Sequence, residues 1–196
     1  MSTLKYLKRS LKSWLFRPFK PFSSIGQHSC VLMPRKLSGT KYISIDDNVI
    51  ISENSWLAAI DEYAGHKYSP HIRIGSNTHI GRYFCLTATG AITIGQDCLF
   101  SEYVYISDHY HGHDPAGGPL VEQALFGKGS TRIGNGTFLG YRVSVLPGVQ
   151  LGNHCVVGAH SVVTHSFPDY SMVAGSPAKL IKKYSVDSKR WEAVKD

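Results

Sequence analysis

The chain has 196 residues, of which 42% are hydrophobic and 18% are charged. This composition supplies a hydrophobic core for one domain and argues against a disordered chain. No apolar run approaches the ~18 residues that span a bilayer, which argues against a transmembrane protein. The net charge of +7 comes from the first 45 residues, which contain nine basic residues and no acid. Because the remainder is slightly acidic, we expect no binding to nucleic acid.

Residues 1–41 form a basic N-terminal segment. Leucines and Trp14 fall on one stripe of residues 3–16 with basic residues beside it, which predicts an amphipathic helix. Pro18 ends this helix, and residues 17–41 are expected to be irregular. Charges interrupt the apolar residues, so we expect no secretory signal, a cytoplasmic location and reduced cysteines.

Apolar residues recur every six positions in residues 42–168. The longest unbroken series is Ile133, Leu139, Val145, Leu151, Val157 and Val163. An earlier series with one insertion contains Ile74, Ile80, Leu86, Ile94, Phe100 and Ile106, and a weaker one contains Ile45, Ile51 and Leu57. A period of six is neither helical nor that of an alternating strand. It predicts an all-β fold, a parallel β-helix in which each hexad directs one apolar side chain inward.

Residues 108–131 interrupt the hexads with a long segment that contains Asp108, His109, His111 and His113. Long loops inside compact domains are usually functional. In an extended segment the three histidines share one face, and each is a candidate general base. Asp108 would then point to the other face, where we expect an acceptor contact or a loop bond rather than orientation of His109.

Residues 169–196 are expected to cap the β-helix. Met172 to Ala174 predict a strand, and residues 186–194 predict a short helix. Cys98 and Cys155 occupy the fifth place of their hexads, where small side chains pack inward, so core thiols are favoured over nucleophiles.

The segment from Ile133 to Tyr184, together with the upstream ISDHYHGHDP, resembles the hexapeptide-repeat acyltransferases. The resemblance is to their polysaccharide O-acetyltransferase branch, which is similar to the maltose and galactoside acetyltransferases. It implies a left-handed β-helix that assembles as a homotrimer. It also implies direct acetyl transfer from acetyl-CoA to a hydroxyl of a carbohydrate acceptor, such as an O-antigen or capsule precursor, without a metal ion.

The same resemblance implies roles for individual residues. His109 takes the place of the family's catalytic base, and Asp108, His111 and Cys85 are candidates for acceptor binding. The candidates for CoA binding are Gly140 and Tyr141 through their backbone, Ala159, Thr164 and Lys179.

Several alternatives remain open at this point. The runner-up within the enzymes is a nucleotide-sugar N-acyltransferase, and a β-solenoid without catalysis is a second reading. A metal site of the kind used by the trimeric β-helix carbonic anhydrases is a further alternative, because imidazole is a common zinc ligand. An HxHxH pattern within one loop does not match the split spacing of their ligands, however, which disfavours this alternative. Residues 3–16 either dock on an anionic membrane surface or cap the open end of the β-helix.

Overall fold

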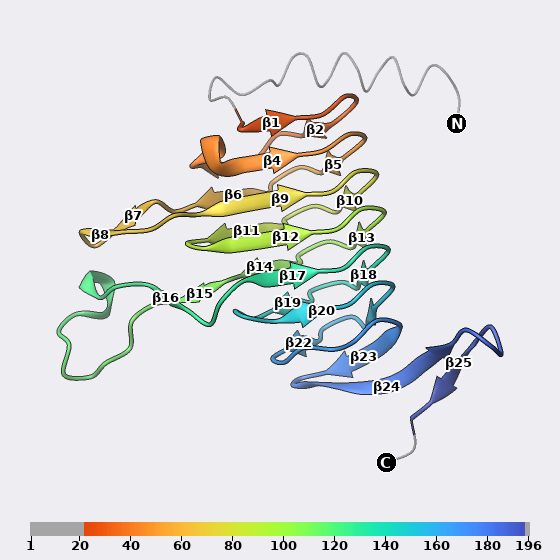
Figure 1. Ribbon diagram of the computed structural model, residues 1–196. Helices are drawn as coiled ribbons and strands as arrows, with labels where there is room; N and C mark the ends of the chain where they lie inside the picture. The colour runs from red at the N-terminus through yellow and green to blue at the C-terminus, as the bar shows by residue number, and fades with distance from the viewer. Residues whose placement is uncertain (1–21, 195–196) are drawn as a thin grey trace.

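The computed structural model describes residues 22–194, which form a left-handed parallel β-helix (Figure 1). Each coil contributes one short strand to each of three faces, here named A, B and C in chain order. The fold therefore confirms the architecture that the six-residue period predicts. The helix expected over residues 3–16 lies outside the described residues. No helix within residues 22–194 is long and apolar enough to cross a bilayer.

The strands of the three faces stack in a regular order. Face A contains β1 (Ser24–Ile25), β4 (Ile43–Ile45), β9 (His71–Ile74), β12 (Ala91–Ile94), β17 (Thr131–Ile133) and β20 (Gln150–Leu151). Face B contains β2 (Cys30–Val31), β5 (Ile50–Ile51), β10 (His79–Ile80), β13 (Leu99–Phe100), β18 (Phe138–Leu139) and β21 (Val156–Val157). Face C contains β3 (Lys36–Ser38), β6 (Trp56–Ala59), β11 (Cys85–Ala88), β14 (Tyr105–Ser107), β19 (Ser144–Val145) and β22 (Val162–Val163).

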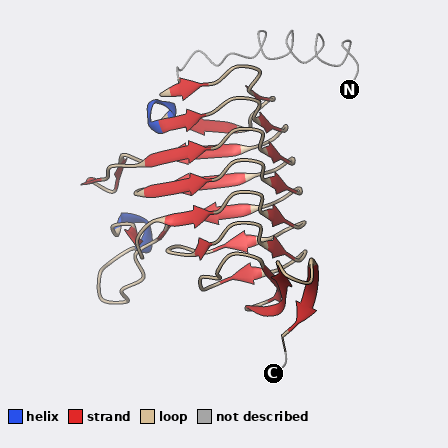
Figure 2. Cartoon of the chain, turned by 45° about the vertical axis from the view of Figure 1, so that its right-hand side comes forward, coloured by secondary structure: helices blue, strands red, loops and turns tan. Residues whose placement is uncertain are grey.

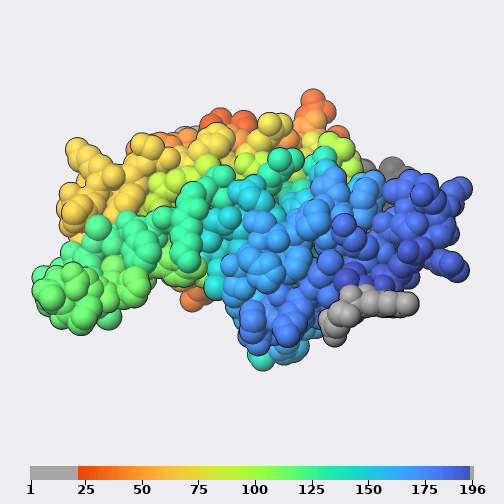
Figure 3. Space-filling view, turned by 60° about the horizontal axis from the view of Figure 1, so that its bottom comes forward, coloured from red at the N-terminus to blue at the C-terminus, as the bar shows by residue number. Residues whose placement is uncertain are grey.

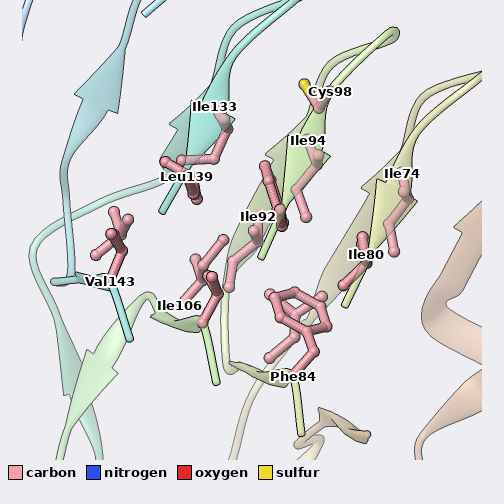
Figure 4. Close-up of a cluster of buried hydrophobic side chains, with 14 of the residues drawn as sticks. Ile74, Ile80, Phe84, Ile92, Ile94, Cys98, Ile106, Ile133, Leu139 and Val143 are labelled. Atoms are coloured by element: carbon pink, nitrogen blue, oxygen red, sulfur yellow. The ribbon is translucent and has the colours of Figure 1, made fainter. Parts of the chain in front are cut away.

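The core runs through the middle of the coils. Ile74, Ile94 and Ile133 occupy equivalent places on successive strands of face A and point inward (Figure 4). Each of them is at most 1% exposed. Cys98 and Cys155 are also buried, as their place in the hexad predicts. Because each hexad buries the side chains of its first and fifth places, insertions are accommodated at the edges between faces.

The first coil corrects the boundary expected at residue 42. β1 pairs in parallel with β4, so the β-helix already includes residues 24–38. Ile25, Val31 and Leu37 continue the six-residue spacing into the segment that was expected to be irregular. Pro34 is compatible with this coil because it lies between β2 and β3, at an edge where no ladder hydrogen bond is required.

The C-terminal segment consists of strands. β23 (Ser171–Gly175) follows β21 in parallel on face B, and β24 (Ala178–Ser185) and β25 (Arg190–Ala193) extend it in antiparallel fashion. The strand expected at Met172 is present. The short helix expected over residues 186–194 is wrong, because β25 pairs with β24 and the Trp191 ring packs edge-on against Tyr184 with centroids 5.5 Å apart.

Three insertions leave the β-helix at one edge, between the end of face C and the start of face A, here named the C–A edge. They are the 3₁₀ turn η1 (Thr40–Tyr42), the hairpin β7 (Glu62–Tyr63) and β8 (His66–Lys67), and the long loop. The loop begins with β15 (His109–Tyr110), passes η2 (Leu120–Glu122) and returns through β16 (Phe126–Gly127). It spans residues 108–130, because Thr131 already belongs to β17. The hairpin and the loop project from the same side of the molecule (Figure 2).

Candidate active site

The centre of the candidate site is a pair of consecutive residues at the C–A edge. β14 ends at Ser107, and Asp108 and His109 follow with exposed fractions of only 2% and 8%. Nδ1 of His109 lies 2.9 Å from Oδ1 of Asp108. The expectation that Asp108 faces away from His109 is therefore wrong. The alternation of an extended strand ends at Ser107, where the chain turns into the loop.

The carboxylate of Asp108 is held by the preceding coil. The backbone N–H of Thr89 donates to Oδ1 at 2.9 Å, and that of Gly90 donates to Oδ2 at 2.8 Å. Both oxygens are thus engaged inside the protein, so the structure does not support the expected acceptor contact of Asp108. A carboxylate that accepts from Nδ1–H places the lone pair of a neutral imidazole on Nε2.

Ser107 holds the backbone of His109. Its hydroxyl donates to the His109 carbonyl oxygen at 2.9 Å and lies 3.2 Å from the His109 amide nitrogen, which donates to it. Thr87, on the neighbouring strand, donates to Ser107 Oγ at 3.3 Å. Sequence reasoning missed Ser107, Thr87, Thr89 and Gly90, because the register that brings two coils together is not visible in the local sequence.

The second ring nitrogen of His109 remains available. This nitrogen, Nε2, makes no hydrogen bond to any of residues 22–194. In the same range, only Oγ of Ser55 and Nε1 of Trp56 are side-chain polar atoms that are both buried and without a hydrogen-bond partner. Nε2 of His109 is absent from that set, so it keeps contact with solvent. A buried, oriented imidazole with one accessible nitrogen is the arrangement expected of a general base.

The other two loop histidines lie apart from His109. His111 packs edge-on against Tyr63, with ring centroids 5.4 Å apart, and His113 stacks on Phe126 at 5.1 Å. The shared face expected for the three side chains is not formed, because the loop is not a continuous strand. Within the described part of the chain, no three His, Cys, Asp or Glu side chains are grouped to hold a metal ion.

Cys85 lies on the outer surface of face C, next to the candidate site. It is paired in register with Trp56 on one side and Tyr105 on the other, two positions before Thr87. Burial raises the pKa of the Cys85 thiol to about 11, although Arg35 opposes the shift. Cys85 therefore carries a neutral thiol at physiological pH, which is a poor nucleophile.

Three of the expected CoA-binding residues meet at the edge between faces B and C, here named the B–C edge. Gly140 and Ala159 lie on adjacent coils, and a Cβ at Gly140 would come within 2.7 Å of the Ala159 nitrogen. Glycine is therefore required at position 140. Neither the Tyr141 nor the Ala159 amide donates a hydrogen bond within residues 22–194. These amides form a row of free donors for a ligand.

The two remaining expected CoA contacts have different places. Lys179 is exposed on β24 and pairs with Ala174, whose methyl group lies against Gly158, so it continues the B–C edge toward the C-terminus. Thr164 lies at the C–A edge instead, with its hydroxyl 3.2 Å from Nδ1 of His165. The structure thus groups Gly140, Tyr141, Ala159 and Lys179 at the B–C edge. Thr164 lies at the opposite edge of face C.

Comparisons with known proteins fit this geometry. Residues 130–165 match the family model for the bacterial transferase hexapeptide repeat. A protein named as the lipopolysaccharide biosynthesis O-acetyl transferase WbbJ of Escherichia coli K12 is 39% identical over 127 residues, which are 62% of this chain and 65% of that protein. A protein of Mycobacterium tuberculosis, named as an acetyltransferase, is 34% identical over 70% of this chain and 45% of its own length. The chain therefore spans less than two thirds of these relatives.

The solved structures give the same fold. A crystal structure of AntD, an N-acyltransferase from Bacillus cereus in complex with dTDP and 3-hydroxybutyryl-CoA, superposes with a TM-score of 0.69. The match covers 95% of this chain and 91% of AntD at 21% sequence identity, so it supports the fold alone. The repeat and the relatives together make the chain similar to the bacterial transferase hexapeptide-repeat proteins, with which it shares the coiled fold.

Proposed function

We propose that the protein transfers an acetyl group from acetyl-CoA to a hydroxyl of a bacterial surface-polysaccharide sugar, such as an O-antigen or capsule precursor. The observation that carries this proposal is the buried Asp108–His109 pair with Nε2 of the imidazole left accessible. An alcohol is a weak nucleophile at neutral pH and needs such a base. The similarity to the E. coli lipopolysaccharide O-acetyl transferase supports the class of acceptor.

The proposed reaction needs one base and one site for the oxyanion. Nε2 of His109 accepts the proton of the acceptor hydroxyl while the hydroxyl oxygen attacks the carbonyl carbon of the thioester. The carbonyl oxygen becomes an oxyanion, which the free amide N–H of Tyr141 can hold. The tetrahedral intermediate then expels the CoA thiolate, and the imidazolium of His109 returns the proton to the sulfur. The products are an acetyl ester and CoA.

Two copies of the chain are needed to complete this site. His109 lies at the C–A edge and Tyr141 at the B–C edge, on opposite sides of face C. A neighbouring copy in a homotrimer can bring its own B–C edge to the His109 of this one.

The acceptor is proposed to lie across the outer surface of face C, between these two edges. Cys85 is two positions from Thr87, which contacts Ser107 beneath the imidazole. His111 lies on the loop side of the same base. Both are therefore suited to contact the sugar that receives the acetyl group.

A nucleotide-sugar N-acyltransferase is the second candidate, favoured by the shared fold with AntD. Its acceptor would be an amine, which also needs a base once it is protonated in water. A test with amino-sugar nucleotides beside neutral saccharides, with CoA release as the readout, separates the two activities.

The first prediction concerns the Asp108–His109 pair. His109→Ala should lower kcat at least ~10²-fold, because it removes the general base. Asp108→Asn should also lower kcat at least ~10²-fold, because an amide can donate to Nδ1 and so favour the wrong tautomer. The measurement is CoA release with a saccharide acceptor, supported by light scattering to show that assembly is retained.

Two control variants accompany this measurement. Asp97→Asn changes an exposed carboxylate that bonds to Asn77 at a distant edge, and it should leave kcat unchanged. His111→Ala should retain most of the turnover. If His109→Ala stays active while His111→Ala is inactive, the base is His111 and the proposed role of Asp108 is wrong.

The second prediction concerns the shared site. His109→Ala copies lack the base, and Ala159→Trp copies carry a bulky ring at the exposed cofactor edge, so each variant alone should be inactive. Mixed trimers should regain about a quarter of the wild-type activity, because hybrid sites combine both intact halves. A mixture that exchanges subunits, as mass spectrometry can show, and regains no activity would place the whole site within one chain.

The third prediction concerns residues 3–16, which we propose to contact the inner, cytoplasmic face of the membrane. The full chain should co-sediment with anionic but not neutral vesicles, since each cation near an anionic surface contributes about 1 kcal/mol. Added salt should weaken this binding, and deletion of residues 1–17 should abolish it. If the deletion instead lowers the melting temperature and leaves vesicle binding unchanged, the segment is a cap.

A further inference from the structure

The two large insertions at the C–A edge form one unit. The hydroxyl of Tyr68, beside the hairpin, accepts the backbone N–H of Leu125 in the loop at 2.7 Å. Tyr63 of the hairpin packs against His111 of the loop. Figure 3 shows both segments side by side, projecting beyond the body of the molecule. Residues 60–70 and 108–130 are together named the arm.

Asp61, directly before the hairpin, is bonded to the preceding coil. The Tyr42 hydroxyl donates to Oδ2 of Asp61 at 3.0 Å, and the Lys41 ammonium lies 3.2 Å from the same oxygen. These contacts hold the pKa of Asp61 below its ordinary value. The Tyr68 amide closes the hairpin by donating to the Asp61 carbonyl at 2.8 Å. The backbone of Tyr68 is therefore fixed at the base of the hairpin, and its hydroxyl bonds to the loop from this fixed position.

The tip of the loop is also ordered by its own hydrogen bonds. The Gln123 side-chain amide donates to the carbonyl oxygens of Asp114 at 2.8 Å and Gly118 at 2.9 Å. Its oxygen accepts the Asp114 amide at 3.0 Å. A loop that crosslinks itself in this way presents a preformed surface, which lowers the entropy cost of binding a ligand.

This surface is a shallow hollow of about 510 Å³ on the loop that begins at His109. It is lined by Gly112, His113, Asp114, Gln123, Ala124 and Phe126. Phe126 is 39% exposed, and its ring stacks on His113 with an interplanar angle of 7°. In the antiparallel pair of β15 and β16, Phe126 lies opposite Tyr110, and the adjacent residue Gly127 lies opposite His109. One lining residue of the hollow, Phe126, therefore directly precedes Gly127, the strand partner of His109.

The chemistry of the hollow and of the whole arm suits an uncharged saccharide. An aromatic ring can pack against the C–H face of a sugar, and the carboxylate of Asp114 can accept hydrogen bonds from sugar hydroxyls. The arm contains five acidic residues and only two lysines. This excess of acid disfavours a phosphate or a nucleotide as the occupant.

We propose that the arm binds a sugar unit of the acceptor beyond the unit that receives the acetyl group, so that the acceptor is an oligosaccharide or a growing glycan chain rather than a free monosaccharide. The inference rests on the proposed acetyl transfer to a saccharide. Phe126 is the platform for the additional unit, and Tyr68 is a positioning residue that acts through Leu125.

The test compares the wild type with Phe126→Ala on an array of bacterial surface saccharides of one to six units. Binding to the array and acetyl transfer from labelled acetyl-CoA are both read. The wild type should bind an oligosaccharide at least roughly tenfold more tightly than its component monosaccharide. In Phe126→Ala the ratio of oligosaccharide to monosaccharide affinity should fall roughly three- to tenfold, which is the scale of one aromatic contact. Its KM for the oligosaccharide should rise, whereas its KM for acetyl-CoA should not change.

Leu99→Ala is the matched control, because Leu99 is an exposed apolar residue on face B, away from the arm. It should keep the preference for longer saccharides. Tyr68→Phe removes only the hydroxyl that holds Leu125, so it should speed hydrogen exchange at the Leu125 amide and reduce the same preference. This second variant tests the arm even if Phe126→Ala folds poorly.

Each outcome separates the arm from the reaction itself. Equal acetylation of monosaccharides and oligosaccharides, or equal behaviour of Phe126→Ala and Leu99→Ala, overturns the role of the arm and leaves the proposed transferase intact. Loss of the trimer in Phe126→Ala would make the ring a subunit contact instead. Length-dependent binding without transfer to any saccharide would contradict the proposed reaction, and no saccharide binding at all would contradict both.

Discussion

The parallel register of the coils is the constraint from which the site follows. Each hexad places two side chains in the core, and each strand lies directly on the strand of the coil before it. A coil of this kind has no room for extra residues within a face, so insertions are confined to the edges. The hairpin and the loop both use the C–A edge, which is why segments far apart in sequence come into contact there.

Asp108 links this scaffold to the chemistry. Its carboxylate accepts amides from Thr89 and Gly90 on the preceding coil, and hydrogen bonds to a charged group contribute about 1.5–3 kcal/mol each. The short connection between β11 and β12 leaves these amides without a strand partner, so the edge of one coil holds the Asp108–His109 pair of the next. The orientation of His109 thus depends on the stacking of two coils rather than on the loop alone.

The sequence predicts the parts of the fold that repeat. Spacing alone located the coils from Ile45 to Val163 and the interruption by the loop, because the inward side chain of each hexad has no alternative place. The first coil was missed although Ile25, Val31 and Leu37 keep the period, since nearby prolines suggested irregular chain. The hairpin was missed too, although the spacing of 17 positions from Leu57 to Ile74 was a visible signal.

The site was harder to predict because its contacts cross between coils. His109 was a candidate from its place at the start of the loop, but the role of Asp108 was reversed, since the alternation of an extended strand does not continue past Ser107. No local pattern indicates that Thr89 and Gly90 face Asp108, or that Tyr68 reaches Leu125. Gly140 and Ala159 were candidates through the family resemblance alone, and the structure adds that close stacking on Ala159 restricts position 140 to glycine.

The central claim is that Asp108 holds His109 with the proton on Nδ1 and a lone pair on Nε2. The most direct measurement is the ¹⁵N chemical shift of the His109 ring in the neutral imidazole form, in the wild type and in Asp108→Asn. The account predicts a protonated Nδ1 and an unprotonated Nε2 in the wild type, with this preference lost or reversed in Asp108→Asn. An unprotonated Nδ1 in the wild type, or a tautomer that is unaffected by Asp108→Asn, would contradict it.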